Sequence, residues 1–302
     1  MKKFIVMTGL ILLAASCSNE CLEQESDGTG DGGDGVVPVR VCVSDFSMSV
    51  DEFQKNGTQT RAAQNVVDYK GVGAITLAFY SETTEVLKTT QMRNDASTYT
   101  TFGEFECNLP IGTYTMVVVA RGYTAGDEFT LISATEAGYT SERPRETFCK
   151  TQTVSVASSG ADLNVTLDRI IAKLEIHSTD PLSASVATMR TTYAAGSKSF
   201  NPGTGLATSD DGFSLTNSPS KMGDGTLGIG SYLFLSANEQ KVNVTIQALD
   251  ASSNVLFTKT VTDVPFKRNR ITTLSGAIFT ASASAASFQV EADWLTGTSM
   301  DF

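Results

Sequence analysis

Short runs in which apolar and polar residues alternate recur along most of this 302-residue chain. Residues 37–43 place a valine at every second position, and residues 242–248 and 255–261 repeat the alternation on either side of a turn at 250–254. A period of two brings the apolar side chains to one face of an extended strand. Long alanine- and leucine-rich helical runs are absent, whereas Thr, Ser, Val and Gly abound. We therefore expect an all-β protein.

The expected strands differ in how far they are buried. Residues 114–120 are almost continuously apolar, which is typical of a central strand covered on both faces. Residues 51–67 are polar and expected to be exposed, and residues 124–147, with glycines, a proline and charges, could hold a short helix or a long loop. Roughly seven short strands before Pro181 favour a Greek-key β-sandwich.

The chain begins with a segment typical of a secretion signal. Two lysines precede an apolar stretch at 4–15 that is too short to span a bilayer. Residues 13–17 then resemble a lipoprotein signal box, with Ala14 where the preferred form has leucine. This pattern predicts cleavage before Cys17 and lipidation of that residue, and acyl chains on it would hold the protein in a membrane. The alternative is an ordinary signal peptide with an unrelated cysteine.

The segment after the signal peptide (1–16) predicts a tether. Residues 17–35 are rich in Gly, Asp and Glu, which is typical of a flexible, extended spacer. Glycine–aspartate runs bind calcium as tandem repeats, and this chain has a single copy. The remaining length suggests two domains. We place them at 36–178 and 179–302, because Pro181 ends the preceding strand.

Charge and composition argue against several functional classes. The formal net charge is −11, and no basic stripe occurs, which argues against a nucleic-acid partner. The chain has a single histidine, His177, which excludes any site that needs two. No Gly-x-Ser-x-Gly, His-Glu-x-x-His or phosphate-loop motif occurs. We therefore expect neither an enzyme nor a cofactor.

Four cysteines remain besides Cys17. The spacing of Cys21, Cys42, Cys107 and Cys149 matches no metal site. An exported protein can form disulfides. The sequence leaves two states open for Cys107 and Cys149: a disulfide inside one domain, or two free thiols.

Four stretches, taken in order, carry a resemblance to a known family. They are the signal box at Cys17, Leu109–Thr115 (LPIGTYT), Leu167–Leu174 (LDRIIAKL) and Val264–Gly276 (VPFKRNRITTLSG). Through them, residues 36–302 resemble the fimbrillin superfamily of Bacteroidota, and above all its fimbrial anchor and accessory subunits of the FimB/Mfa type. The resemblance implies two tandem transthyretin-like β-sandwiches on a surface-exposed lipoprotein of the outer membrane. It also implies other fimbrial subunits as partners in a fimbria that supports adhesion.

For polymerising subunits the resemblance implies cleavage by a trypsin-like surface protease, and the corresponding position here is Arg61 with Ala62. Anchor subunits are expected to stay uncut, so stalk, tip and anchor roles are all open. After a cut, the first strand would leave with the lipid and open a groove for a strand of another subunit. The apolar residues of this displaced strand are Val37, Val39, Val41 and Val43. The candidate donor strand, which could also be the last strand of its own sheet, has Phe288, Val290, Ala292 and Trp294.

A second functional class is a monomeric surface lipoprotein that binds a glycan or host matrix. Such a protein would present clustered aromatic side chains on loops. Tyr123, Phe129 and Tyr139 fall in one stretch that the sequence marks as irregular. They are the candidate residues for this alternative.

Overall fold

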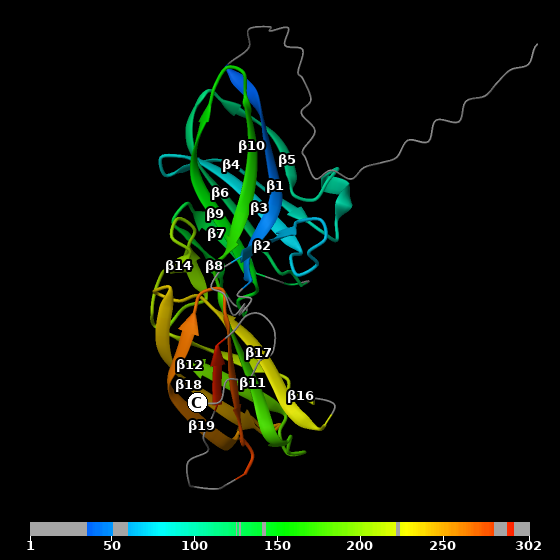
Figure 1. The fold of residues 1–302 in the computed structure, drawn as a ribbon, viewed down its shortest axis with the longest axis vertical. Helices are drawn as coiled ribbons and strands as arrows, with labels where there is room; N and C mark the ends of the chain where they lie inside the picture. Colours follow the sequence, from blue (N-terminus) through cyan, green and yellow to red (C-terminus); the bar gives the residue numbers. More distant parts are fainter. Residues whose placement is uncertain are drawn as a thin grey trace, which may run out of the picture. The chain divides into compact units, whose positions relative to one another are not determined.

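The structure is a computed structural model that describes residues 35–50, 60–124, 126, 128–140, 143–221, 224–280 and 289–292. These residues form strands joined by turns (Figure 1). The helical element of the described chain is one short 3₁₀ helix, η1 (Ala96–Thr98). The all-β class predicted from the alternating runs is therefore confirmed.

Eight strands form the largest sheet, in the order β2-β1-β10-β9-β6-β3-β4, with β5 also paired to β1 (Figure 1). β9 and β10 share only two residue pairs, Asp168 with Cys149 and Arg169 with Phe148. The sheet bends at this corner into two layers, which enclose one apolar core. The bounds are β1 (Val36–Val50), β2 (Thr60–Asn65), β3 (Ala74–Ser81), β4 (Thr84–Met92), β5 (Glu104–Pro110), β6 (Gly112–Arg121), β9 (Thr147–Val156) and β10 (Ala161–Arg169).

The strands β3 and β6 are buried on both faces. Leu77 and Val118 contribute to the core between the two layers, whereas Tyr80 and Val117 belong to a second apolar cluster on the outer side. β6 also lies between two strands, β3 and β9, so it has no free edge. The prediction of a central, doubly covered strand at 114–120 is confirmed.

A small sheet, β14-β13-β8-β7, contributes to this outer cluster. Phe200 of this sheet stacks on Phe234, with ring centroids 4.5 Å apart. The expectation of a short helix or long loop at 124–147 is wrong for residues 129–139, because burial of Leu131 and Tyr139 stabilises a β-hairpin there. The bounds are β7 (Phe129–Ser133), β8 (Glu136–Tyr139), β13 (Ser199–Asn201) and β14 (Leu206–Ala207).

Two further sheets face each other across a third core, in the orders β16-β17-β11-β20-β21 and β15-β12-β18-β19. Ile176 and Leu274 reach this core from the first sheet, and Ile246 and Val264 from the second. The predicted hairpin is confirmed as β18 and β19, which pair from Glu239–Lys267 to Leu249–Val255. The bounds are β11 (Ala172–Pro181), β12 (Thr188–Tyr193), β15 (Phe213–Asn217), β16 (Ser220–Lys221), β17 (Thr226–Leu233), β18 (Glu239–Leu249), β19 (Val255–Lys267), β20 (Ile271–Gly276) and β21 (Gln289–Ala292).

The boundary expected between the two domains falls within the strand β11. The expected boundary between residues 178 and 179 lies inside β11, which pairs antiparallel with β17 and parallel with β20. The change of sheet therefore comes at Ile170 and Ile171, between β10 and β11. The division into two domains stays a prediction, and we move its boundary to this point.

Two strands of the first sheet lie where the sequence gives no strand signal. β2 falls within the polar stretch 51–67, which was expected only to be exposed, and β4 has mostly exposed side chains. Both form because a neighbouring strand supplies their backbone hydrogen bonds, β1 for β2 and β3 for β4.

The two cysteines whose pairing the sequence leaves open are free thiols. Cys107 lies on β5 and Cys149 on β9, and β1 and β10 stand between these strands in the sheet. The Cys107 Sγ donates to the carbonyl of Val39 at 3.6 Å, and the Cys149 Sγ to that of Pro202 at 3.5 Å. A disulfide between them does not form. Cys42 is disulfide-bonded.

The outer aromatic cluster should contribute strongly to stability. Replacing the fully buried Phe234 by alanine removes a ring that stacks on Phe200, so we expect a loss of about 3–5 kcal/mol in the free energy of unfolding. Ile132→Ala is the matched control, because Ile132 is 54% exposed, and it should cost under about 0.5 kcal/mol. Denaturant unfolding followed by circular dichroism measures both values. Equal losses would contradict the assignment of this cluster as core.

Cys149 should make stability depend on alkaline pH. Burial raises the pKa of its thiol to about 12 in the folded state, whereas the unfolded thiol ionises near its ordinary value. As the pH rises past that ordinary value, the unfolded state loses a proton that the folded state keeps, so stability falls. We expect the wild-type protein to lose about 1–1.5 kcal/mol more than Cys149→Ala between about pH 8 and pH 10. Denaturant titrations at the two pH values would refute this by giving parallel changes.

Candidate functional site: the first strand and its neighbours

The strand β1 lies in the interior of the first sheet. It pairs in parallel with β10 along Val39–Ser47. On its other edge it pairs antiparallel with β5 along Val36–Cys42 and with β2 along Asp45–Val50. In Figure 1, β1 (blue) runs beside β10 (green). Most of its backbone is therefore hydrogen-bonded on both sides.

The neighbours of β1 depend on it. Among the described strands, β2 and β5 each pair with β1 alone. β10 shares eight residue pairs with β1 and only two with β9. Removing β1 would therefore leave the backbones of β2 and β5 unpaired, and most of one edge of β10.

The predicted apolar face of β1 lies in the core. Val39, Val41 and Val43 are buried, and Val37 is half-buried against the same cluster. The sequence misses Phe46, which is also fully buried. A bulge between Val43 and Asp45 shifts the alternation by one residue, so a strict period of two places Phe46 on the wrong face.

Phe46 is the centre of an aromatic group. Its ring lies 4.6 Å from that of Phe148 and 5.7 Å from that of Tyr69. The hydroxyl of Tyr69 donates to the Glu146 carboxylate at 2.7 Å. Glu146 in turn pairs with Arg169 at 2.6 Å, and both side chains of this ion pair are almost fully buried. The end of β1 therefore packs on a polar network as well as on the core.

The candidate cleavage position lies in β2. Arg61 is opposite Ser49 and Ala62 is opposite Met48 in the ladder with β1. β2 is the outermost strand in the described sheet order. A protease would therefore have to displace an edge strand held by one ladder, rather than an interior one.

The candidate donor strand is the last strand of its own sheet here. Val290 is opposite Leu274 and Ala292 is opposite Thr272, so β21 pairs with β20 at the end of the sheet order. Phe288 and Trp294, like the lipidation candidate Cys17, lie outside the described residues.

The chain before β21 is fixed by a buried carboxylate. Asp180 accepts the backbone N–H groups of Ile278 at 2.9 Å and Phe279 at 2.7 Å. Both of these side chains belong to the core of the second sandwich. The described chain is thus tied to the body as far as Phe279.

The aromatic residues of the glycan-binding alternative do not form an exposed group. Tyr139 is 1% exposed and packs against Phe129, with ring centroids 5.3 Å apart. Arg121 lies over Phe129 and Tyr123, at 4.7 Å and 5.8 Å from the ring centroids. Tyr139 is a core residue, so the expectation that it offers a loop surface is wrong.

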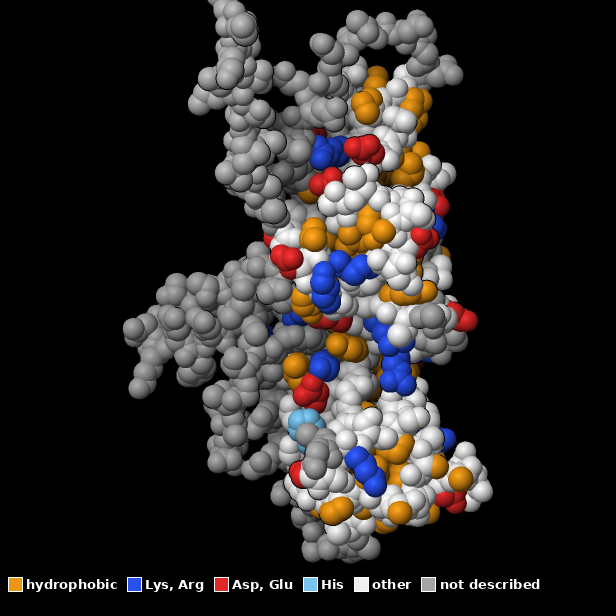
Figure 2. Space-filling model, turned by 90° about the vertical axis from the view of Figure 1, so that its right-hand side faces the viewer, with side chains coloured by type: hydrophobic (Ala, Val, Ile, Leu, Met, Phe, Trp, Pro, Cys, Tyr) orange, Lys and Arg blue, Asp and Glu red, His pale blue; other side chains and the backbone are white. Residues whose placement is uncertain are grey.

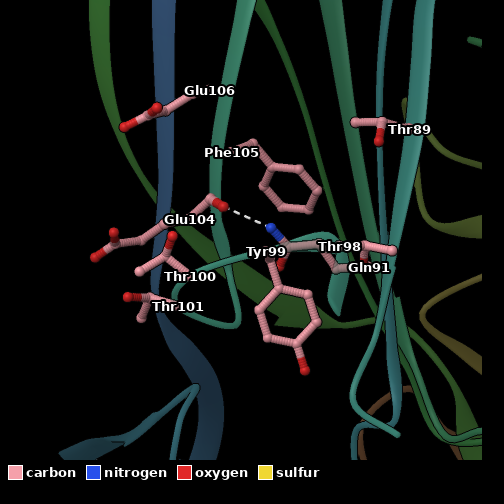
Figure 3. Close-up of a pocket in the computed structure, with 9 residues that line it drawn as sticks. All are labelled: Thr89, Gln91, Thr98, Tyr99, Thr100, Thr101, Glu104, Phe105 and Glu106. Carbon is pink, nitrogen blue, oxygen red and sulfur yellow. Dashed lines mark hydrogen bonds between the residues drawn. The ribbon is translucent and has the colours of Figure 1, made fainter. Parts of the chain in front are cut away.

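A polar cavity lies instead where β4 and β5 face each other without a ladder. Its volume is about 260 Å³. Figure 3 shows Gln91 of β4 reaching across to the backbone of Glu104 on β5, with Phe105 beside it. No local sequence pattern predicts this cavity, because its walls come from two strands and the connection between them. It is lined by Thr89, Gln91, Thr98, Tyr99, Thr100, Thr101, Glu104, Phe105 and Glu106.

Among the described residues, no group of three or more His, Cys, Asp or Glu side chains could hold a metal ion. No helix of the described chain is long and apolar enough to cross a membrane. His177 lies on β11, partly exposed, with Nε2 3.9 Å from Glu175. On the face in Figure 2, Lys and Arg side chains lie in small separate groups among acidic and apolar ones.

Solved structures share this fold at low sequence identity. A candidate adhesin from Bacteroides ovatus gives a TM-score of 0.53 at 8% identity, covering 84% of this chain and 96% of that one. The fimbrial anchor protein Mfa2 from Porphyromonas gingivalis gives 0.45 at 10% identity, covering 84% and 96%. The tip fimbrial protein Mfa3 of the same organism, with a C-terminal truncation, gives 0.41 at 10%, covering 85% and 100%. The Bacteroides ovatus structure thus shares the fold of this chain.

Sequence comparison assigns the chain to a family without a described activity. No curated protein matches the sequence. A family model described as a family of unknown function, DUF6562, matches residues 38–294. The match takes in β1 from Pro38 onward and every later described strand, and the chain belongs to this family.

Proposed function

We propose that this chain is a structural or accessory subunit of a cell-surface fimbria. It is held in the outer membrane by lipid on Cys17 and joins other fimbrial subunits by β-strand addition, which supports adhesion. The observation that carries the proposal is the place of β1. The first strand of the described chain is an interior strand on which β2, β5 and most of one edge of β10 depend.

The surroundings of β1 define what could replace it. A replacement strand would run parallel to β10 and antiparallel to β5, as β1 does. It would offer apolar side chains at alternate positions, to fill the space of Val39, Val41 and Val43. Backbone pairing would supply affinity, and the alternating pockets would supply register.

The C-terminal strand has the required pattern. Phe288, Val290, Ala292 and Trp294 repeat the spacing of Val37, Val39, Val41 and Val43. β21 is an edge strand that pairs only with β20 among the described strands. An edge strand loses one ladder when it leaves, so it costs less to release than an interior strand.

Cleavage alone would not free β1. Burial of Val39, Val41, Val43 and Phe46 stabilises its place by on the order of 10 kcal/mol in total. A cut at Arg61 instead removes the covalent link that gives β1 a high effective concentration beside its groove. An incoming strand that forms the same ladders could then displace it.

A second candidate function, binding of a glycan or host matrix, has one observation in its favour. The cavity between β4 and β5 combines hydroxyl and carboxylate groups with the rings of Tyr99 and Phe105. Sugars bind to such mixtures of polar groups and aromatic surface.

Proteolysis tests the assembly function. Mature protein treated with a trypsin-like protease should yield a new N-terminus at Ala62, and multimers should then appear in size-exclusion chromatography, because the cut lets a second subunit's strand compete for the groove. The double variant Lys55→Ala with Arg61→Ala is the matched control, because it removes both basic residues between β1 and Ala62, and it should keep this link uncut and stay monomeric. If Ala62 never appears as an N-terminus and no multimers form, the polymerising role is wrong.

A glycan array tests the second function. If the cavity binds sugars, Glu106→Gln should lower the bound signal by about tenfold or more, because it removes a charged acceptor from the lining. Glu136→Gln on β8 is the control, since Glu136 is exposed and does not line the cavity. A signal that is absent in the wild type, or unchanged in Glu106→Gln, would contradict glycan binding at this place.

A further inference from the structure

Two parts of the first sandwich lose a neighbour if β1 leaves: the start of β5 and the segment 66–72 that follows β2. The N–H of Val43 donates to Gly103 at 2.9 Å, next to the start of β5, and the N–H of Val66 donates to Ser44 at 3.2 Å. Both bonds would break on release. We infer that Gln91 and Arg93, at and just after the end of β4, are positioning residues that hold these two parts in place and keep the empty groove ready for a new strand. The inference rests on the proposed strand exchange.

Arg93 holds the backbone that follows β2. Its guanidinium also lies 4.0 Å from the centroid of the Phe102 ring, and burial lowers the pKa of this group, although arginine stays charged. Three nitrogens of the guanidinium group bind backbone carbonyls of the segment 66–72. They donate, at 2.8–3.2 Å, to the backbone carbonyls of Val66, Val67, Tyr69 and Val72.

The segment 66–72 has further anchors that do not involve β1. Val66 and Val72 are buried, and the Tyr69 hydroxyl donates to Glu146. Among the described strands, by contrast, β2 forms a ladder with β1 alone. Asn65 accepts the N–H groups of Asp68 and Tyr69, so after a cut at Arg61 and loss of β1 the new chain end would lose its pairing through Gln64 and be held from Asn65 onward.

Gln91 holds the start of β5. Its amide nitrogen donates to the carbonyl of Glu104, and its amide oxygen accepts the N–H of Gly103 at 2.7 Å (Figure 3). The carboxamide thus offers one donor and one acceptor to β5, as a peptide group of a neighbouring strand would. Gln91 is only 5% exposed, so water does not compete strongly for these bonds.

None of the bonds made by the Gln91 and Arg93 side chains reaches a residue of β1. They persist when β1 is absent. β5, one wall of the groove, would otherwise have no ladder at all, because β4 and β5 are not paired. If β5 is already ordered, binding of the incoming strand does not carry the entropy cost of ordering β5.

The test measures strand capture by a body without β1. A recognition sequence for a site-specific protease is placed within residues 51–59, so that the result does not depend on Arg61. After cleavage, the β1 fragment is displaced in mild denaturant and removed, and a labelled synthetic peptide of residues 36–50 is added. The readouts are the rate of peptide capture and the hydrogen exchange of the peptide-free body.

The variants separate positioning from overall folding. Gln91→Leu and Arg93→Met should slow capture by about tenfold or more, because each removes several side-chain hydrogen bonds to the backbone of one of these two parts. Exchange should rise at 103–110 in Gln91→Leu and at 66–72 in Arg93→Met, and only when β1 is absent. Thr90→Ala is the matched control, since its hydroxyl bonds to Thr76 at 2.9 Å and touches neither part. Gln91→Glu and Arg93→Lys, which keep some of the bonds, should give intermediate rates and serve where the first variants fail to fold.

Each outcome has a distinct meaning. If the wild type captures the peptide and all variants capture it at the same rate, the positioning roles of Gln91 and Arg93 are overturned, but strand exchange is not. Absence of capture by every body, the wild type included, would overturn strand exchange and this inference with it. Faster exchange in the uncut variants to the same extent as in the β1-free ones would overturn the inference as well, because it would mark a purely structural role.

Discussion

The two backbone ladders of β1 are the interaction on which the first sandwich depends. Buried N–H and C=O groups must be paired, and β1 supplies the partners for β2, β5 and most of one edge of β10. Any strand with the same direction and alternation could satisfy these groups. The fold therefore requires a strand at this position without requiring that it come from the same chain, and this is the physical basis of the proposed strand exchange.

The buried ion pair of Arg169 and Glu146 explains why distant stretches of the sequence belong together. Arg169 also donates to the side chain of Asn269 at 3.1 Å, and the N–H of Asn269 donates to Ile171 at 2.9 Å. The stretches LDRIIAKL and VPFKRNRITTLSG, which carry much of the family resemblance, thus meet at the passage from β10 to β11. A buried charge that loses its partner is costly, so both stretches are constrained at once.

Local patterns predicted the parts of the fold that local physics decides. The valine face of β1, the double burial of β6 and the β18–β19 hairpin follow from alternation, continuous apolarity and a turn. β2 and β4 did not follow, because a partner strand rather than their own side chains stabilises them. The roles of Gln91 and Arg93 could not be predicted either, because the type of a polar residue does not indicate which distant carbonyl its side chain will bind. Phe46 was missed through a single bulge.

The link between β1 and β2 gives the proposed assembly a direction. A subunit whose link is intact keeps its own β1 in the groove, tied by the chain to the segment that carries Cys17. Its groove cannot accept a strand, because covalent connection makes the native β1 a far stronger competitor than any free strand. It can still offer β21, which pairs at the opposite end of the chain with β20 alone among the described strands. In the proposed assembly, an uncut subunit would therefore donate a strand without accepting one, and it would end the polymer at its lipid-bearing end.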